Sequence, residues 1–265
     1  MRKSLLAVAC VLSCALPATA SAIVGGTDVP AGQYTNVAEI TLGQLFGCTG
    51  TLIAPQWVMT AGHCGSITGA AVSTPAGWPP QAIDVRMGSN KAGQGARFPV
   101  SQVIVEPSYL VTSGYDITLL KLAAPAVGIP STPVASAAER AIWEPGDLQK
   151  IVGWGTTSSG GSAPSTLQQA SVPVTTDATC GGAYSDFDAA TMVCAGYPQG
   201  GTDTCQGDSG GPMFATNATG ALRLTGATSF GQGCADPGYP GVYARVADTA
   251  LRTWIASVAP GAVAP

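Results

Sequence analysis

The sequence predicts an all-β fold of two six-stranded antiparallel β-barrels followed by a C-terminal helix. Short apolar segments rich in β-branched residues recur along the chain, and Gly, Pro, Asn or Asp separates them. The chain has 265 residues, of which 35 are Gly and 20 are Pro, a supply of turn residues that suits many short strands. About a dozen such segments exceed the needs of one small barrel, so two barrels are expected, although the spacing alone leaves a β-sandwich open.

Twelve segments have the length and pattern of strands. They are residues 37–42, 50–53, 57–60, 83–87, 101–105, 117–122, 148–153, 168–174, 192–194, 212–214, 222–230 and 241–245.

Only residues 249–258 are expected to be helical, because their apolar side chains recur at spacings of three and four. The stretch 123–138, rich in Ala, Pro and Ser, is the expected linker. We therefore expect an N-terminal barrel over 23–135, a C-terminal barrel with the helix over 136–258, and a frayed tail over 259–265.

Residues 1–22 have the pattern of a secretory signal peptide. A cationic start, Met1-Arg2-Lys3, is followed by about 13 apolar residues and then by small residues. The apolar run is too short to cross a hydrocarbon core of about 30 Å. We expect a secreted, extracellular protein without a membrane anchor. The cleavage point stays open, and Ser21-Ala22 could form a two-residue propeptide.

The charge and cysteine content exclude several classes of function. Only 10% of residues are charged and the formal net charge is -4, which gives no positive field for nucleic acid or anionic lipid. Six of the eight cysteines lie beyond residue 22. An even number in a secreted chain favours three disulfides over free thiols. Zinc is disfavoured by the single His and the absence of a Cys-x-x-Cys motif.

Two residues could support nucleophilic catalysis. His63 is the only His of the chain, and Ser209 lies in Gly207-Asp208-Ser209-Gly210-Gly211, which matches the pattern G-x-S-x-G. An α/β-hydrolase would need a His after that Ser, and none follows. The only possible order is His, Asp, Ser, the order of chymotrypsin-like double barrels. An esterase of the α/β-hydrolase type is therefore excluded.

Several ordered motifs then identify a family resemblance. Between residues 23 and 258 the chain resembles the trypsin-like, chymotrypsin-fold serine proteases of the trypsin subgroup. The motifs are Ile23-Val24-Gly25-Gly26, Thr60-Ala61-Gly62-His63-Cys64, residues 116–122 (DITLLKL), Gly153-Trp154-Gly155, residues 192–196 (MVCAG), residues 203–212 and Pro240-Gly241-Val242-Tyr243.

The resemblance implies a catalytic triad of His63, Asp116 and Ser209. Ser209 is expected to be the nucleophile, His63 the base, and Asp116 the carboxylate that orients the imidazole. Several Asp residues lie between the other two, so only the family motif selects Asp116. The backbone N–H groups of Gly207 and Ser209 are expected to form the oxyanion hole.

The resemblance also implies the substrate pocket and the disulfides. Asp203 is expected at the pocket base, where a buried carboxylate favours Arg or Lys before the scissile bond. The other expected substrate-binding residues are Thr204, Ser229, Phe230, Gly231 and Gly241. The expected disulfides are Cys48–Cys64, Cys180–Cys194 and Cys205–Cys234.

Activation is where this chain departs from the family pattern. In the family a new amino terminus, here Ile23, forms an ion pair with the Asp before the nucleophile, here Asp208. Most relatives are zymogens with a basic residue before that Ile, whereas Ser21-Ala22 precedes it here. Because of this departure, we expect signal peptidase, or another protease that removes Ser21-Ala22, to expose Ile23 directly.

The expected function is a secreted serine endopeptidase that cleaves after Arg or Lys. Expected partners are protein or peptide substrates and protein protease inhibitors, and the protein is expected to be a monomer. No cofactor and no metal are expected. A calcium site is not expected because the loop between Met87 and Phe98 has no acidic residue to bind the ion. The alternative is a catalytically inactive homologue that acts as a binding protein, which is disfavoured because all three triad residues are present.

Overall fold

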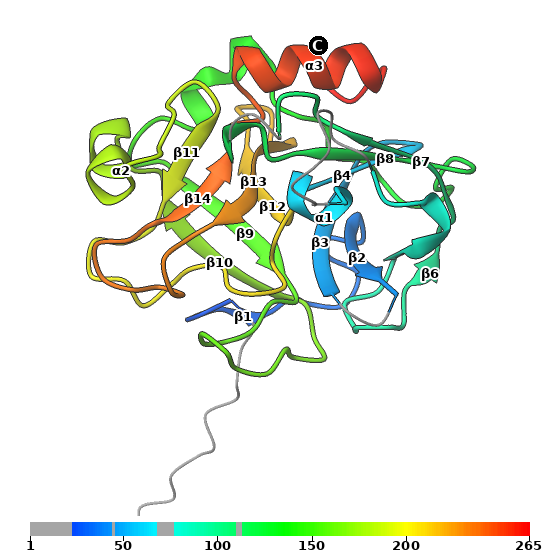
Figure 1. Ribbon diagram of the computed structural model, residues 1–265, viewed down its shortest axis with the longest axis horizontal. Helices are drawn as coiled ribbons and strands as arrows, with labels where there is room; N and C mark the ends of the chain where they lie inside the picture. Colours follow the sequence, from blue (N-terminus) through cyan, green and yellow to red (C-terminus); the bar gives the residue numbers. More distant parts are fainter. Residues whose placement is uncertain (1–22, 44–45, 68–76, 110–112) are drawn as a thin grey trace, which may run out of the picture.

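Two antiparallel sheets of seven strands each lie side by side and form the body of the protein (Figure 1). This computed structural model describes residues 23–43, 46–67, 77–109 and 113–265. The expected signal peptide lies outside the described residues. Within them, no helix combines the length and the hydropathy that a membrane crossing requires.

The first sheet comes from the first half of the chain, in the order β6-β5-β2-β3-β4-β8-β7. Alternate side chains of β5 are buried, which matches its alternation of apolar and polar residues. The strands are β2 (Val37–Leu42), β3 (Phe46–Ala54), β4 (Trp57–Thr60), β5 (Ile83–Met87), β6 (Ala96–Arg97), β7 (Val100–Val105) and β8 (Thr118–Leu122).

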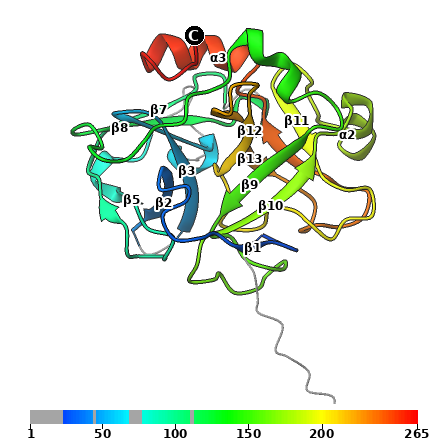
Figure 2. The same ribbon diagram turned by 180° about the vertical axis from the view of Figure 1, so that it is seen from behind.

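The second sheet has the order β1-β10-β9-β12-β13-β14-β11. Its first strand comes from the start of the described chain, and Thr27 pairs with Gln169 of β10 (Figure 2). The strands are β1 (Thr27–Asp28), β9 (Leu148–Gly153), β10 (Gln168–Pro173), β11 (Met192–Ala195), β12 (Pro212–Thr216), β13 (Leu222–Phe230) and β14 (Gly241–Ala244).

The predicted fold class is confirmed. Each sheet contains six longer strands, and all twelve lie where the sequence pattern placed them, within a few residues at their ends. The seventh strand of each sheet, β1 or β6, has only two residues and carries no alternation that a pattern could reveal.

The two sheets share their largest apolar cluster. It includes Met59 and Leu119 from the first sheet and Phe214 and Tyr243 from the second, all fully buried. Burial of this surface is the main force that holds the halves together. The loops that carry the candidate site extend from these two sheets, so the shared core holds the loops of one sheet in place relative to those of the other.

The helix α3 (Thr249–Val258) has the predicted bounds. The short helices α1 (Gly62–Gly65) and α2 (Asp177–Ala183) and the 3-10 turns η1 (Pro80–Ala82), η2 (Ser113–Tyr115) and η3 (Ala137–Ile142) were not expected. Each is too short for a helical period of apolar residues to be visible in the sequence.

The expectation of a frayed tail at 259–265 is wrong. Ala262 is fully buried, and its carbonyl accepts a hydrogen bond from Val134 N at 2.8 Å. Ala264 N donates to Val134 O, also at 2.8 Å, so the tail pairs in parallel with the linker. On its other side Val134 pairs with Leu224 of β13. Small apolar residues allow this close packing, and composition alone does not distinguish it from fraying.

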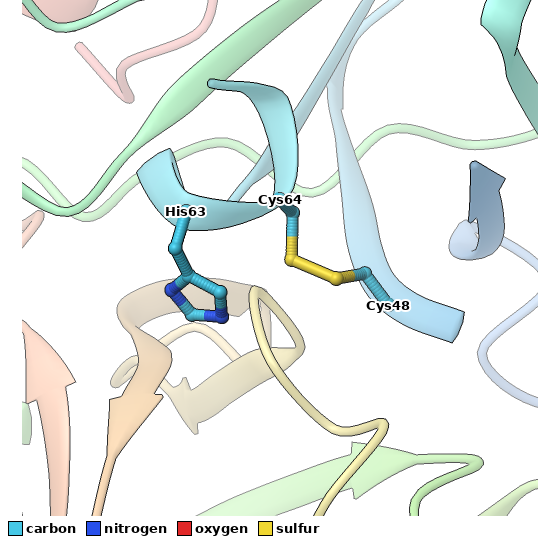
Figure 3. Close-up of side chains that lie close together, drawn as sticks. All are labelled: Cys48, His63 and Cys64. Atoms are coloured by element: carbon cyan, nitrogen blue, oxygen red, sulfur yellow. A yellow bond between two sulfur atoms is a disulfide. The ribbon is translucent and has the colours of Figure 1, made fainter. Parts of the chain in front are cut away.

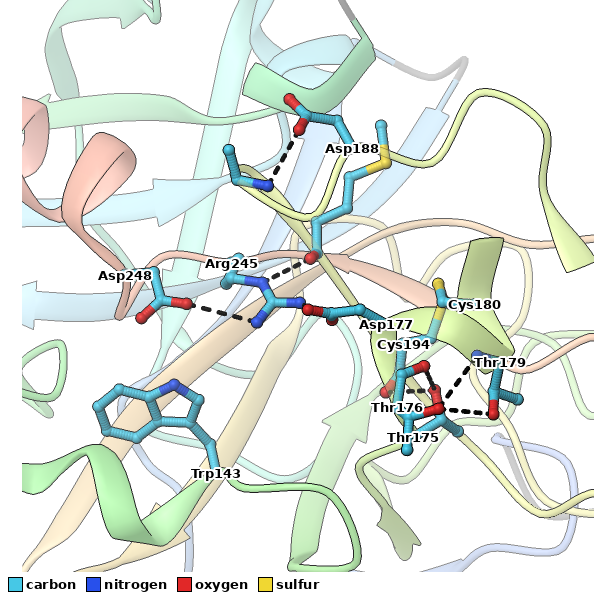
Figure 4. Close-up of polar contacts among 12 residues, drawn as sticks. Trp143, Thr175, Thr176, Asp177, Thr179, Cys180, Asp188, Cys194, Arg245 and Asp248 are labelled. Carbon is cyan, nitrogen blue, oxygen red and sulfur yellow. Dashed lines mark hydrogen bonds and ion pairs between the residues drawn. A yellow bond between two sulfur atoms is a disulfide. The ribbon is translucent and has the colours of Figure 1, made fainter. Parts of the chain in front are cut away.

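A buried arginine ties the second sheet to two helices (Figure 4). Arg245, which follows β14, donates from Nε to the carbonyl of Met192 at 2.6 Å and forms ion pairs with Asp177 of α2 and Asp248 beside α3. The side chain of Arg245 is 6% exposed. Buried charges are tolerated when they are paired in this way, so the contacts fix the register of both helices against the sheet.

Candidate active site

The structure places His63 in α1, directly after β4. The neighbouring Cys64 forms a disulfide with Cys48 of β3, which anchors the short helix to the first sheet (Figure 3). These three residues are also the one cluster of potential metal ligands among the described residues. Because both sulfurs are joined in the disulfide, they are not thiolates and cannot serve as metal ligands.

His63 makes two kinds of contact with Asp116. Its backbone N donates to Asp116 Oδ1 at 2.9 Å, and its Nδ1 lies 2.9 Å from Oδ2 and 3.2 Å from Oδ1. The carboxylate side chain is 5% exposed and the imidazole 35% exposed. When Nδ1 carries the ring proton, it donates to the carboxylate and leaves Nε2 free to accept another proton.

The pKa of His63 is raised above its ordinary value. Burial acts against the imidazolium and lowers the pKa, but the hydrogen bond to Asp116 and its negative charge together outweigh that effect. The pair is therefore built to hold a proton that the imidazole has accepted.

Ser209 comes from the second sheet's side of the molecule and is held against the first. Its carbonyl accepts a hydrogen bond from Thr49 N at 2.9 Å. Thr49 follows Cys48, whose disulfide partner Cys64 follows His63. One hydrogen bond and one disulfide thus connect the serine loop to the histidine helix.

The turn around Ser209 leaves two backbone donors unused. Asp208 N, Gly210 N and Gly211 N each donate to a carbonyl, whereas Gly207 N and Ser209 N have no acceptor among the described residues. Gly207 has φ +101°, a conformation that side chains disfavour, and its carbonyl accepts from the Thr49 hydroxyl at 3.0 Å. Two free N–H groups in one turn can stabilise an oxygen that gains negative charge when both point toward it.

Comparisons with known proteins agree with this geometry. The family model described as Trypsin matches residues 23–255. The chain is 44% identical to "Trypsin" of Saccharopolyspora erythraea over 84% of this chain and 93% of that protein. It is 38% identical to "Trypsin 5G1" of Aedes aegypti over 89% and 84% of the two chains, and 38% identical to "Trypsin-1" of Astacus astacus over 84% and 95%.

The chain belongs to the trypsin family. It is therefore a member of a family of serine proteases, which are hydrolases.

Beside Ser209, this trypsin-family chain has a cavity of about 180 Å³. Asp203 lies in its wall and is 5% exposed. Five of the residues expected to bind substrate line it: Asp203, Thr204, Ser229, Phe230 and Gly231. Gly241 is not in the lining, but a Cβ at that position would lie 2.4 Å from Asp203 Oδ1, so only glycine leaves the carboxylate in place.

The carboxyl of Asp203 is costly to ionise because it is buried. Burial raises its pKa to about 6, although hydrogen bonds from Thr204 and Ala235 oppose the shift. A cationic ligand would offset the burial and restore the ionised form. The cavity is thus complementary to a positively charged group.

Sequence reasoning missed several residues of this cavity. Gln206, Thr228 and Gly233 line it, and Tyr184 packs edge-on against Phe230 with ring centroids 5.6 Å apart. The Tyr184 hydroxyl donates to the Pro240 carbonyl at 2.9 Å. Tyr184 lies far from the cavity in sequence, between α2 and β11, so no local motif could have revealed it. The structure has the three disulfides that the resemblance implies.

The residues expected to act in activation are both buried. Ile23 is fully buried with φ +61°, an unusual angle for a β-branched residue, and the next residue, Val24, pairs with Asp203. Asp208 accepts hydrogen bonds from Gly155 N at 2.8 Å and Cys205 N at 2.9 Å. Burial raises its pKa to about 7 despite these bonds. A buried carboxyl of this kind favours a cationic partner.

Proposed function

We propose that this chain is a secreted serine endopeptidase that hydrolyses peptide bonds after Arg or Lys through an acyl-enzyme on Ser209. The observation that supports it most is that Ser209 and the buried carboxyl of Asp203 line the same cavity. A long cationic side chain that reaches Asp203 brings the following carbonyl carbon to the Ser209 hydroxyl.

The chemistry follows from the contacts of His63. As Ser209 Oγ bonds to the carbonyl carbon, His63 Nε2 takes the hydroxyl proton, and Asp116 stabilises the imidazolium. The N–H groups of Gly207 and Ser209 hold the oxyanion. The imidazolium then gives its proton to the leaving amine, which breaks the C–N bond. Water, deprotonated by His63, finally hydrolyses the ester and restores Ser209.

The substrate backbone binds beside β13. Ser229 and Phe230 end that strand and Gly231 follows it. An added Cβ on Gly231 would have its nearest neighbour 4.0 Å away, at the Tyr184 hydroxyl, so the space above this residue is open. Extended peptides pair with such strand edges through main-chain hydrogen bonds, which suits protein substrates and protein inhibitors.

We also propose that the cleavage that removes the signal segment during export also converts the chain to its mature form. Removal of residues 1–22 would leave Ile23 as the amino terminus, and its ammonium group would pair with Asp208. The burial of Ile23 and the raised pKa of Asp208 support this pairing.

The test is to measure kcat/KM of the secreted protein on peptides that differ only in having Arg, Lys, citrulline or Phe before the scissile bond. Citrulline has the shape of Arg without its charge. The proposal predicts a preference for Arg over citrulline on the order of 10⁴-fold, because citrulline would leave the buried carboxylate unpaired.

Two variants separate the parts of the proposal. Ser209→Ala should remove turnover of all four peptides, and Asp203→Asn should remove the preference for cations while leaving the nucleophile intact. Equal rates on Arg and Phe peptides in the wild type would disprove the pocket assignment. Turnover that survives in Ser209→Ala would disprove the acyl-enzyme.

A further inference from the structure

The cationic residues of this chain are placed unusually for a protein with the proposed specificity. Of 11 Lys and Arg residues, Arg2 and Lys3 precede Ile23, and the other nine lie in the described part. Five of the nine are in strands: Arg86, Arg97, Lys121, Lys150 and Arg223. Arg140 lies in η3, Arg252 in α3, and Arg245 is 5% exposed. Only Lys91 lies in a turn.

The loops are correspondingly free of cations. No Lys or Arg occurs in residues 98–120, 122–139, 151–222 or 224–244. These stretches include the loops that border the cavity beside Ser209 and the exposed residues 158–163. A second copy of the enzyme therefore meets no Arg or Lys in any of these loops.

Three of the five strand residues have a paired strand on each side. Lys121 pairs with Trp57 of β4 and Gln102 of β7, Lys150 pairs with Ser171 of β10 and Phe214 of β12, and Arg86 pairs with Glu39 of β2 and Arg97 of β6. Arg97, in the edge strand β6, pairs only with Arg86, and its Nε forms an ion pair with Asp84. Arg223 pairs with Ala215 on one side, and its Nε forms an ion pair with Glu139. A protease needs an extended segment that is free to pair with its own strand edge. These bonds become accessible only when a sheet opens, a state populated at about 10⁻³ to 10⁻⁶ in stable proteins.

Lys91 is exposed and lies outside the longer strands, but its backbone and its side chain are both paired. Its Nζ donates to Thr166 Oγ1 at 2.6 Å, and the residue forms a β-bridge with Thr166. On the other side of the bond that would be cut, Ala92 N donates to Ser165 O at 2.9 Å. Both the cationic head and the backbone around this bond must leave their partners before another copy could bind them.

We propose that the folded protein is closed to its own activity, because none of its nine described Arg and Lys residues lies in an extended segment that is free of backbone partners. The inference rests on the proposed specificity for Arg and Lys. The same feature extends to the amino terminus, where Ser21-Ala22 in place of a basic residue gives the enzyme no site to cut before Ile23. Other proteases would therefore have to expose Ile23 and to degrade the mature enzyme.

The test compares self-cleavage with peptide cleavage in the same samples. The purified protein and Ser209→Ala are incubated at high concentration under native conditions and followed by intact mass spectrometry, while turnover of the Arg peptide is measured in parallel. Ser162→Arg places a cation in the exposed loop, where neither Ser162 N nor Ala163 N has an acceptor among the described residues, and Ser162→Gln is the matched control. As a control for cleavability, denatured Ser209→Ala chain is added to active enzyme.

The expected result is that the wild type and Ser162→Gln stay intact, denatured chain is cut after its Lys and Arg residues, and Ser162→Arg is cut after position 162 about 1,000-fold faster than any native bond. Native wild-type fragments that end at one of the nine cations, and are absent in Ser209→Ala, would overturn the inference while the proposed function stands. An intact Ser162→Arg would also overturn it. Failure to cut the Arg peptide would refute the proposed function and this inference together.

Discussion

The hydroxyl of Ser229 donates a hydrogen bond to Asp116 Oδ2, with the two oxygen atoms 2.5 Å apart. The same oxygen lies 2.9 Å from His63 Nδ1. Ser229 belongs to β13 of the second sheet, whereas Asp116 precedes β8 of the first. The carboxylate that orients His63 is therefore held from both halves of the molecule.

Replacing Ser229 by Ala should lower kcat/KM by roughly tenfold or more, because a hydrogen bond to a charged group contributes about 1.5 to 3 kcal/mol. The decrease should fall mainly on kcat, measured with the Arg peptide. Ser229→Thr retains the hydroxyl and should recover part of the rate. A change in KM alone would show that Ser229 acts only in substrate binding.

The His63 and Asp116 pair predicts a defined pH profile. Since Asp116 raises the pKa of His63, Asp116→Asn should lower that pKa and move the acid limb of kcat/KM to lower pH. The maximum rate should fall by roughly 10⁴-fold, as in the general triad template. The profile is measured between pH 4 and 9. An acid limb that stays in place would mean that another group controls it.

Binding of a cation in the cavity should depend on the ionisation of Asp203. The pKa of this carboxyl is about 6, so the affinity for a small amidinium inhibitor should be constant at high pH and fall as the pH drops below about 6. The dissociation constant is measured by calorimetry in a His63→Ala background, which removes the titration of the imidazole. Asp203→Asn should bind weakly at every pH.

Stability should distinguish a chain that begins at Ile23 from a longer one. In the longer chain the pKa of Asp208, about 7, lies above its unfolded value, so its ionisation lowers the free energy of unfolding as pH rises from about 4 to 7. An ammonium group on Ile23 would offset this loss. The difference in Tm between the two chains should therefore grow over that range.

The control for this prediction is Asp208→Asn, in which the two chains should differ by an amount that does not vary with pH. A Tm difference that is flat from pH 4 to 7 in the wild-type background would contradict the proposed ion pair.

Because the C-terminal tail, residues 259–265, is docked against Val134, its truncation should lower the stability of the protein. Removal of residues 262–265 deletes the buried Ala262 and both hydrogen bonds to Val134. The expected cost is about 1 to 3 kcal/mol, seen as a lower Tm by calorimetry. An extension after the exposed Pro265 should leave Tm unchanged. An unchanged Tm after truncation would restore the expectation of a frayed tail.

Much of the fold was accessible from the sequence because its strands are local patterns. The alternation Ile83, Val85, Met87 alone specifies one buried face of β5. The tail and β1 depend instead on pairing with segments more than 100 residues away, Val134 and Gln169 respectively. Such pairing leaves no periodic signal in a short stretch of small or polar residues.

The residues of the site likewise divide into those that the sequence reveals and those that only the fold brings together. His63 and Ser209 stand out as a single His and a glycine-flanked Ser, and the family motif adds Asp116 and Asp203. Tyr184 could not be found, because its contact with Phe230 depends on how the end of α2 lies relative to the end of β13. The two unused N–H groups at Gly207 and Ser209 were implied only by resemblance, since hydrogen bonding is a property of the folded turn.

The backbone angle of Ile23 has a consequence for maturation. The torsion φ requires the carbonyl carbon of a preceding residue, so it exists only in a chain that extends before Ile23. In that chain the value of +61° costs about 1 to 3 kcal/mol. A chain that starts at Ile23 has no such torsion, and its terminal nitrogen rotates freely about the bond to Cα. Peptide-bond cleavage before Ile23 would therefore relieve this backbone strain, in addition to freeing the amino group for the proposed ion pair with Asp208.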